Sequence, residues 1–191
     1  DVYKRQIYRR PSGKREFLKA AQIIRKLRLA AFYDVILDNP FETDKERIDT
    51  VLTLIETPKP FYTQFFSLSF YPGTELRKLA LEKNLIRKDE YQSKDYLLYD
   101  KTVINNLTRL ATFLPSFWSK FLLKLYRLKP NSLWFKMNIF TARIFAIIFY
   151  EHFTYFKVIR LSQDRKLAAT FRVLPYYTKE GFSRFLKQFD L

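Results

Sequence analysis

The chain has 191 residues, of which 48% are hydrophobic and 28% are charged, a balance typical of a globular protein rather than a disordered one. It contains no cysteine, which excludes disulfides, zinc fingers and thiolate-held clusters within these residues. Residues 1–99 carry 19 Lys and Arg against 14 Asp and Glu, whereas residues 100–191 carry 16 against 5. This asymmetry predicts a boundary near residue 100 and favours an anionic partner for the second part.

The first six residues, DVYKRQ, lack the apolar segment of a secretory signal. They back-translate to GAT GTG TAT AAG AGA CAG, which matches the mosaic-end adapter of transposase-based sequencing libraries. We therefore expect residues 1–6 to be an adapter artefact, and the chain to be a fragment whose authentic sequence begins near Ile7. A natural basic segment left after processing is the alternative.

The first half of the chain predicts alternating helices and strands. The expected helices cover residues 14–29, 44–56 and 75–83, and the expected strands cover residues 33–38 and 61–71. Ser12, Thr43 and Thr74 are suited to cap the three helices, and Glu46 completes a capping box with Thr43. This order predicts an α/β unit with a parallel sheet, of which two strands form only a part.

Side chains of the two expected strands alternate between two faces. Tyr33, Val35 and Leu37 share one face of the first strand, and Asp34, Ile36 and Asp38 share the other. If the first set packs against helices, the second set points to the opposite side, where a barrel enzyme keeps polar groups. In the second strand, Ser67, Ser69 and Tyr71 fall on one face.

Two linked motifs carry a resemblance to a known family. YDVILDNPFET (33–43), followed by FFSLSFYPGTELRKLALEKNLI (65–86), resembles the second half of the barrel in radical S-adenosylmethionine enzymes, especially the branch with an N-terminal cobalamin-binding domain. The family pattern is D-x-I-x-x-x-P-x-E-T, a helix, and a strand that ends in P-G-T. The matching residues are Asp34, Ile36, Pro40, Glu42, Thr43, Pro72, Gly73 and Thr74.

The resemblance implies an α/β fold: an incomplete parallel (βα) barrel of about two strands at 7–99, then a mainly α-helical, basic region at 100–191. It implies that the parent protein holds S-adenosylmethionine against a [4Fe–4S] cluster, with cobalamin as an additional cofactor of that branch. A methyltransferase or cyclase reaction would fit such a parent. The residues that the resemblance places on the S-adenosylmethionine or substrate side are Asp34, Ile36, Asp38, Asn39, Ser69 and Tyr71.

The Cys-x3-Cys-x2-Cys loop that holds the cluster in this family is absent from the 191 residues. We therefore expect no catalytic residue, metal ligand or bound cofactor in the chain itself, which would be inactive without the missing N-terminal half of the polypeptide. Relatives often carry glycine where Asp38 stands, and Asp38 and Asn39 are equally suited to stabilise the turn after the strand. The segment from Pro72 to Thr74 is first a turn and a helix cap.

Beyond residue 100 the pattern is helical. Helices are expected over residues 101–113, 116–128, 132–161 and 178–189, with an ambiguous strand at 171–174. The segment 138–156 is nearly apolar, but Arg143, Glu151 and His152 interrupt it. It therefore falls short of the ~18 uninterrupted apolar residues of a spanning helix, and a buried or interfacial helix is expected, with a transmembrane helix as the less favoured alternative.

Basic and aromatic residues alternate over 115–161, which three interpretations accommodate. An amphipathic surface could bind an anionic membrane, which would place the protein in the cytoplasm, peripheral to the inner face of the membrane. A nucleic-acid surface is the less favoured interpretation. Packing of these helices on the barrel is the third. The alternative to an enzyme fragment is thus a non-catalytic, basic module that binds a membrane surface or RNA.

Overall fold

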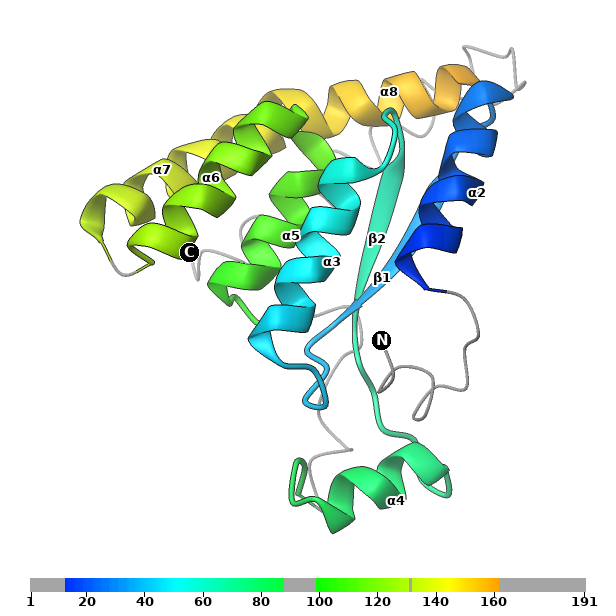
Figure 1. The fold of residues 1–191 in the computed structure, drawn as a ribbon, viewed down its shortest axis with the longest axis vertical. Coiled ribbons are helices and arrows are strands. Elements are labelled where there is room, and N and C mark those ends of the chain that lie inside the picture. The colour runs from blue at the N-terminus through cyan, green and yellow to red at the C-terminus, as the bar shows by residue number, and fades with distance from the viewer. Residues whose placement is uncertain (1–12, 88–98, 131, 162–191) are drawn as a thin grey trace.

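The computed structural model describes residues 13–87, 99–130 and 132–161 (Figure 1). The elements are α2 (Lys14–Lys26), β1 (Phe32–Leu37), α3 (Asp44–Glu56), β2 (Tyr62–Ser67), α4 (Glu75–Glu82), α5 (Val103–Phe113), α6 (Ser116–Leu128), α7 (Leu133–Phe145), the π-helical segment η2 (Ala146–Tyr150) and α8 (Glu151–Leu161). The described part is mixed α/β and mostly helical, with a two-stranded parallel sheet. The adapter-like residues 1–6, the predicted cap Ser12, the ambiguous strand at 171–174 and the helix at 178–189 lie outside the described residues.

The sheet confirms the predicted parallel pairing. β1 and β2 run parallel with Phe32 opposite Tyr62 and Leu37 opposite Ser67, and α3 connects them. β2 ends at Ser67, four residues before the predicted end. The reason lies in β1: Asp38 has a φ of +55° and turns the chain away, so the last sheet bond runs from the Leu68 amide to the Leu37 carbonyl.

Helix starts follow the predicted caps. The amide of Thr43 donates to Glu46 Oε2 at 2.8 Å, and the amide of Glu46 donates to Thr43 Oγ1 at 3.3 Å, which confirms the capping box of α3. Thr74 accepts a hydrogen bond from the Arg77 amide at the start of α4. Helix α2 differs: its N-cap is Gly13 and not the predicted Ser12, and the Gly13 amide donates to the side chain of Glu16.

The end of α2 differs from the prediction by three residues. The helix stops at Lys26 because Arg28 adopts a φ of +56°, the amide of Arg28 donates to the Arg25 carbonyl, and the amide of Leu29 donates to the Ile24 carbonyl. This is a Schellman motif. Glycine is the usual residue at its left-handed position, and the sequence has arginine there.

One hydrophobic core crosses residue 100. The core face of β1 carries Tyr33 and Val35, which pack toward the helices as predicted. The buried core residues come from α3, the segments at the start of the strands, α5, α6, α7 and η2: Ala31, Val51, Leu54, Ile55, Phe61, Ile104, Leu107, Leu110, Ala111, Phe113, Leu114, Leu122, Leu123, Phe135, Ile139 and Ala146. Thr63 Oγ1 of β2 also donates to Thr112 Oγ1 of α5 at 3.0 Å. The change in charge near residue 100 is therefore no boundary in the packing.

The opposite face of the sheet is open in the described part of the chain. Phe32 and Ile36 keep 49% and 46% of their surface exposed, and Asp34 and Gln64 are exposed as well. Helices α3 and α5 lie side by side along the sheet, α8 runs across the end at which β2 begins, and α7 lies beside α6 (Figure 1). The helices thus cover one face and leave the other uncovered.

The predicted helix over residues 132–161 forms as α7, η2 and α8, capped by Ser132, whose Oγ accepts from the Phe135 amide at 3.1 Å. Leu133–Thr154 is long and apolar enough to cross a membrane by length and composition, with a mean hydropathy of 1.3. Only 18% of its most apolar window is buried. The buried alternative for residues 138–156 is therefore wrong for most of the described part of that window: Ile139 and Ala146 are buried in the core, but Phe140, Phe145, Ile148 and Phe149 are exposed.

Candidate functional site

Asp38 joins three elements at the carboxyl end of the sheet. Its Oδ2 accepts hydrogen bonds from Ser67 Oγ at 2.8 Å and from the amide of Asp100 at 2.9 Å. Its Oδ1 accepts from Asn105 Nδ2 at 2.7 Å. Because Asp38 directly follows β1, Ser67 belongs to β2 and Asn105 to α5, the carboxylate links the ends of both strands to helix α5. The positive φ of Asp38 takes its side chain out of the alternation that places Asp34 on the open face.

Asn39 is buried and shapes the turn that follows β1. Its side-chain oxygen accepts from the Phe41 amide at 3.1 Å, which forms an Asx turn. Its carbonyl accepts from Arg47 Nη2 at 3.1 Å and from the Glu42 amide at 3.2 Å. The turn-stabilising interpretation of Asn39 thus agrees with its contacts.

The other predicted site residues are not gathered around Asp38. Asp34 and Ile36 share the open face of β1. Ser69 and Tyr71 follow the end of β2; Ser69 is half-buried, and Tyr71 is 55% exposed. The carbonyl of Tyr71 accepts from Thr74 Oγ1 at 2.8 Å, and the turn between them contains Gly73 at a φ of +80°.

The chain lacks the usual ligands of an iron–sulfur cluster. No three His, Asp or Glu side chains converge within the described ranges, and the sequence has no cysteine. A [4Fe–4S] cluster needs thiolates as its usual ligands. Any cluster of a longer parent would therefore be held by residues other than these.

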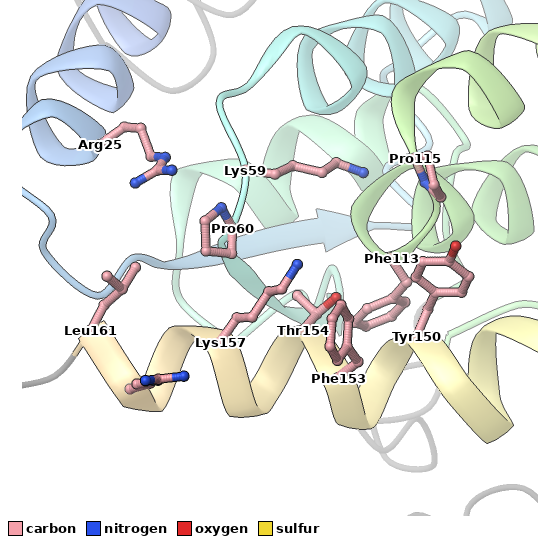
Figure 2. A pocket seen from close by; sticks show the side chains of 11 residues that line it. Arg25, Lys59, Pro60, Phe113, Pro115, Tyr150, Phe153, Thr154, Lys157 and Leu161 are labelled. Atoms are coloured by element: carbon pink, nitrogen blue, oxygen red, sulfur yellow. The ribbon is translucent and has the colours of Figure 1, made fainter.

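A basic pocket lies at the opposite end of the sheet, where the chain enters β2 (Figure 2). Its volume is about 550 Å³. Four cationic residues line it: Arg25 near the end of α2, Lys59 before β2, and Lys157 and Arg160 on α8. Sequence reasoning missed this pocket, since only the i, i+3 spacing of the last two cations signals a shared face.

Lys59 is the most buried of these cations. Its ammonium group donates to the carbonyls of Ala111, at 2.8 Å, and Leu114, both at the C-terminal end of α5. The C-terminal carbonyls of a helix attract a cation, so Lys59 serves as a cap. Burial lowers the pKa of Lys59 from its usual value of 10.5 to about 8.

An exposed apolar surface covers the C-terminal helices. We call it the aromatic surface, and it consists of Phe117, Trp118, Phe121, Leu133, Trp134, Met137, Phe140, Phe145, Ile148, Phe149 and Phe153, each at least 39% exposed. Ring contacts continue this surface from α6 to α7. The ring centroid of Phe121 lies 6.1 Å from that of Trp118 and 6.3 Å from that of Trp134. Lys120, Lys124 and Lys136 are exposed on the same helices.

No family model, curated protein or solved structure matches this chain. In the described residues, three places offer themselves for a function: the open face of the sheet, the basic pocket and the aromatic surface. The open face belongs to β1 and β2, whereas the basic pocket and the aromatic surface meet at Phe153 of α8.

The titration of Lys59 leads to a prediction on stability. Because its pKa in the folded chain, about 8, lies below the usual 10.5, the folded chain releases this proton first as the pH rises. The free energy of unfolding is therefore expected to rise with pH over this interval, by up to about 2 kcal/mol between pH 8 and pH 10. Urea unfolding at each pH measures it. The Lys59→Met variant should lack this increment, and equal pH profiles of the two proteins would contradict the assignment.

Proposed function

We propose that the chain is the C-terminal half of the barrel of a radical S-adenosylmethionine enzyme of the cobalamin-binding branch. The observation that carries the proposal is the open face of the sheet. Two strands, consecutive in the chain and joined by α3, pair in parallel, with helices on one face. Asp34 and Ile36, from the first family motif, are exposed on the other face, as residues inside a barrel would be without its remaining strands.

In this proposal the chain contributes a binding wall. The exposed side chain of Ile36 offers an apolar surface on which an adenine ring can pack, and the Asp34 carboxylate beside it can accept hydrogen bonds from a ribose or an amino group. Asp38 and Asn39 hold the carboxyl end of the sheet and the turn after it. Ser69 and Tyr71 lie at that same end, where ligands of parallel sheets bind.

The experiment that tests this proposal is to sequence the source DNA upstream of the codon for Ile7. We expect an open reading frame that continues upstream of this codon and encodes Cys-x3-Cys-x2-Cys. Source DNA that encodes DVYKRQ directly after a start codon, with no cysteine loop, would sink both the adapter assignment and the enzyme proposal.

The aromatic surface favours a second function, association with an anionic membrane surface. Soluble proteins rarely expose contiguous apolar patches of this kind, and such patches mark interaction sites. Tryptophan and phenylalanine next to lysines on the same helices suit the boundary between lipid headgroups and acyl chains. Leu133, Met137 and Ile148 are aliphatic and cannot stack on bases, which makes a nucleic-acid surface the weaker alternative.

Membrane association leads to a direct prediction. The chain should co-sediment with vesicles of phosphatidylglycerol and phosphatidylcholine, and much less with phosphatidylcholine alone. Trp134→Ser should weaken this binding by at least about tenfold, because a large apolar side chain contributes roughly 1.5–3 kcal/mol when it leaves water. Ile23→Ser is the matched control, since Ile23 on α2 is exposed to 59% against 56% for Trp134.

Two outcomes would overturn the membrane function. In one, Trp134→Ser and Ile23→Ser weaken vesicle binding equally; in the other, Trp134→Ser does not weaken vesicle binding. Binding to single-stranded RNA that falls with Trp134→Ser, without any binding to vesicles, would transfer the aromatic surface to the nucleic-acid alternative.

A further inference from the structure

The basic pocket has no role in either proposed function. It lies where β2 begins, whereas the ligands of a parallel sheet bind at the carboxyl ends of the strands, where Asp38 lies. We propose that this pocket binds the phosphate group of a phosphate ester whose other part is apolar.

The positive charge of the pocket favours binding of an anion. Arg25, Lys59, Lys157 and Arg160 line one cavity, and no Asp or Glu is among the described residues that line it. Within the described ranges, no ion pair engages Arg25, Lys157 or Arg160. Like charges held around a common space repel one another, and a bound phosphate would relieve that repulsion.

The four cationic side chains would contribute to phosphate binding in different ways. In Figure 2 the head groups of Arg25 and Lys157 extend from opposite sides toward Pro60, and the ammonium of Lys59 extends toward Pro115. Because Lys59 already donates to two carbonyls of α5, its contribution to an anion is mainly its charge. Arg25, Lys157 and Arg160 would supply the direct hydrogen bonds, and guanidinium groups suit phosphate oxygens in particular.

The rest of the lining selects an apolar partner for that phosphate. Phe113, Tyr150, Phe153 and Leu161 line the pocket, and the ammonium of Lys157 lies 4.0 Å from the centroid of the Phe153 ring. A volume of about 550 Å³ lies within the range of small-molecule sites, ~300–1,000 Å³. Phe153 also belongs to the aromatic surface, so the phosphate could come from a lipid headgroup or from a soluble ester.

The test measures binding to the 191-residue chain by titration calorimetry with three probes: inorganic phosphate, octyl phosphate, and vesicles of phosphatidic acid in phosphatidylcholine. Octyl phosphate should bind more tightly than inorganic phosphate, because only the ester occupies the apolar lining. The variant Lys157→Ala/Arg160→Ala should bind octyl phosphate at least about tenfold more weakly, since it removes two charge-assisted hydrogen bonds to the phosphate.

The matched control is Arg15→Ala/Lys19→Ala, which removes the same charge from α2, outside both the pocket and the aromatic surface. It should change octyl phosphate affinity less than about twofold, because neither side chain lines the pocket and charges outside it are screened by water and salt. Circular dichroism checks that both variants fold, and all four replaced residues are exposed.

Each outcome decides something. If the pocket variant alone loses binding of both octyl phosphate and phosphatidic acid vesicles, the site is supported with a lipid headgroup as the source of the phosphate. If the pocket variant alone loses octyl phosphate binding, and the unaltered chain does not bind phosphatidic acid vesicles, the site is supported with a soluble ester as the source. Equal weakening in both variants, or octyl phosphate binding that survives in the pocket variant, overturns it. Trp134→Ser tests the membrane function separately, because Trp134 does not line the pocket.

Discussion

Replacement of Asp38 by alanine is expected to lower the free energy of unfolding by about 3 kcal/mol. The carboxylate accepts hydrogen bonds from Ser67, Asn105 and the amide of Asp100, so its removal leaves three donors without this acceptor. The side chains of Ser67 and Asn105 are only 3% and 5% exposed, and a buried donor that loses its partner costs roughly 1–3 kcal/mol. The retained bond from Asn105 to the Asp100 carbonyl keeps the total in the lower half of the range summed over these two donors.

Urea unfolding followed by circular dichroism measures this loss, and Asp34→Ala is the control. Asp34 lies on β1 four residues earlier, and its side chain is exposed on the open face, so its removal should change stability by less than about 0.5 kcal/mol. Asp38→Asn keeps one acceptor oxygen and should fall between wild type and Asp38→Ala. A loss in Asp34→Ala as large as in Asp38→Ala would contradict the role given to Asp38.

Replacement of Phe135 by alanine is expected to cost about 3–5 kcal/mol, the usual range for a buried phenylalanine. Phe135 of α7 is fully buried, and its ring centroid lies 5.9 Å from that of Tyr126 on α6. It belongs to the same core as residues of α3 and the segment before β2. Its loss should therefore destabilise the sheet together with the C-terminal helices, in a single unfolding transition.

Phe117→Ala is the control for Phe135→Ala, because Phe117 on α6 is 64% exposed. It should change stability by less than about 0.5 kcal/mol. The alternative result is two separate unfolding transitions, with Phe135→Ala shifting only the transition of the residues beyond 100. It would mean that the segment beyond residue 100 folds as an independent module. That result would contradict the shared core.

Local signals allowed much of this fold to be predicted from the sequence. The Thr43 and Glu46 capping box and the alternation around Val35 depend on neighbours within a few residues, and both are found as expected. The end of α2 was predicted wrongly because Arg28 occupies a left-handed position that usually signals itself by glycine. The end of β2 depends on the turn at Asp38, which is distant in the sequence.

Contacts between distant segments explain what sequence reasoning could not find. The basic pocket combines Arg25 and Lys59 with Lys157 and Arg160, about a hundred residues later along the chain, and no periodicity links such positions. The apolar segment 138–156 has a composition that suits both a buried and an exposed helix. Only the packing of α7 and α8 on their neighbours shows which of its side chains face outward.

The π-helical segment η2 sets the rotation of α8 about its axis relative to α7. A π turn accommodates one residue more than an α turn, and one residue of an α-helix corresponds to about 100° of rotation. Val158 and Thr154 of α8 are buried beside the sheet in this setting, while Lys157 and Arg160 line the pocket. A chain one residue shorter in η2 would swing those two cations out of the cavity and bring a different set of α8 side chains against β2. The rotation of α8 relative to α7 thus determines where Lys157 and Arg160 lie and also which way the part of the aromatic surface on α8 faces.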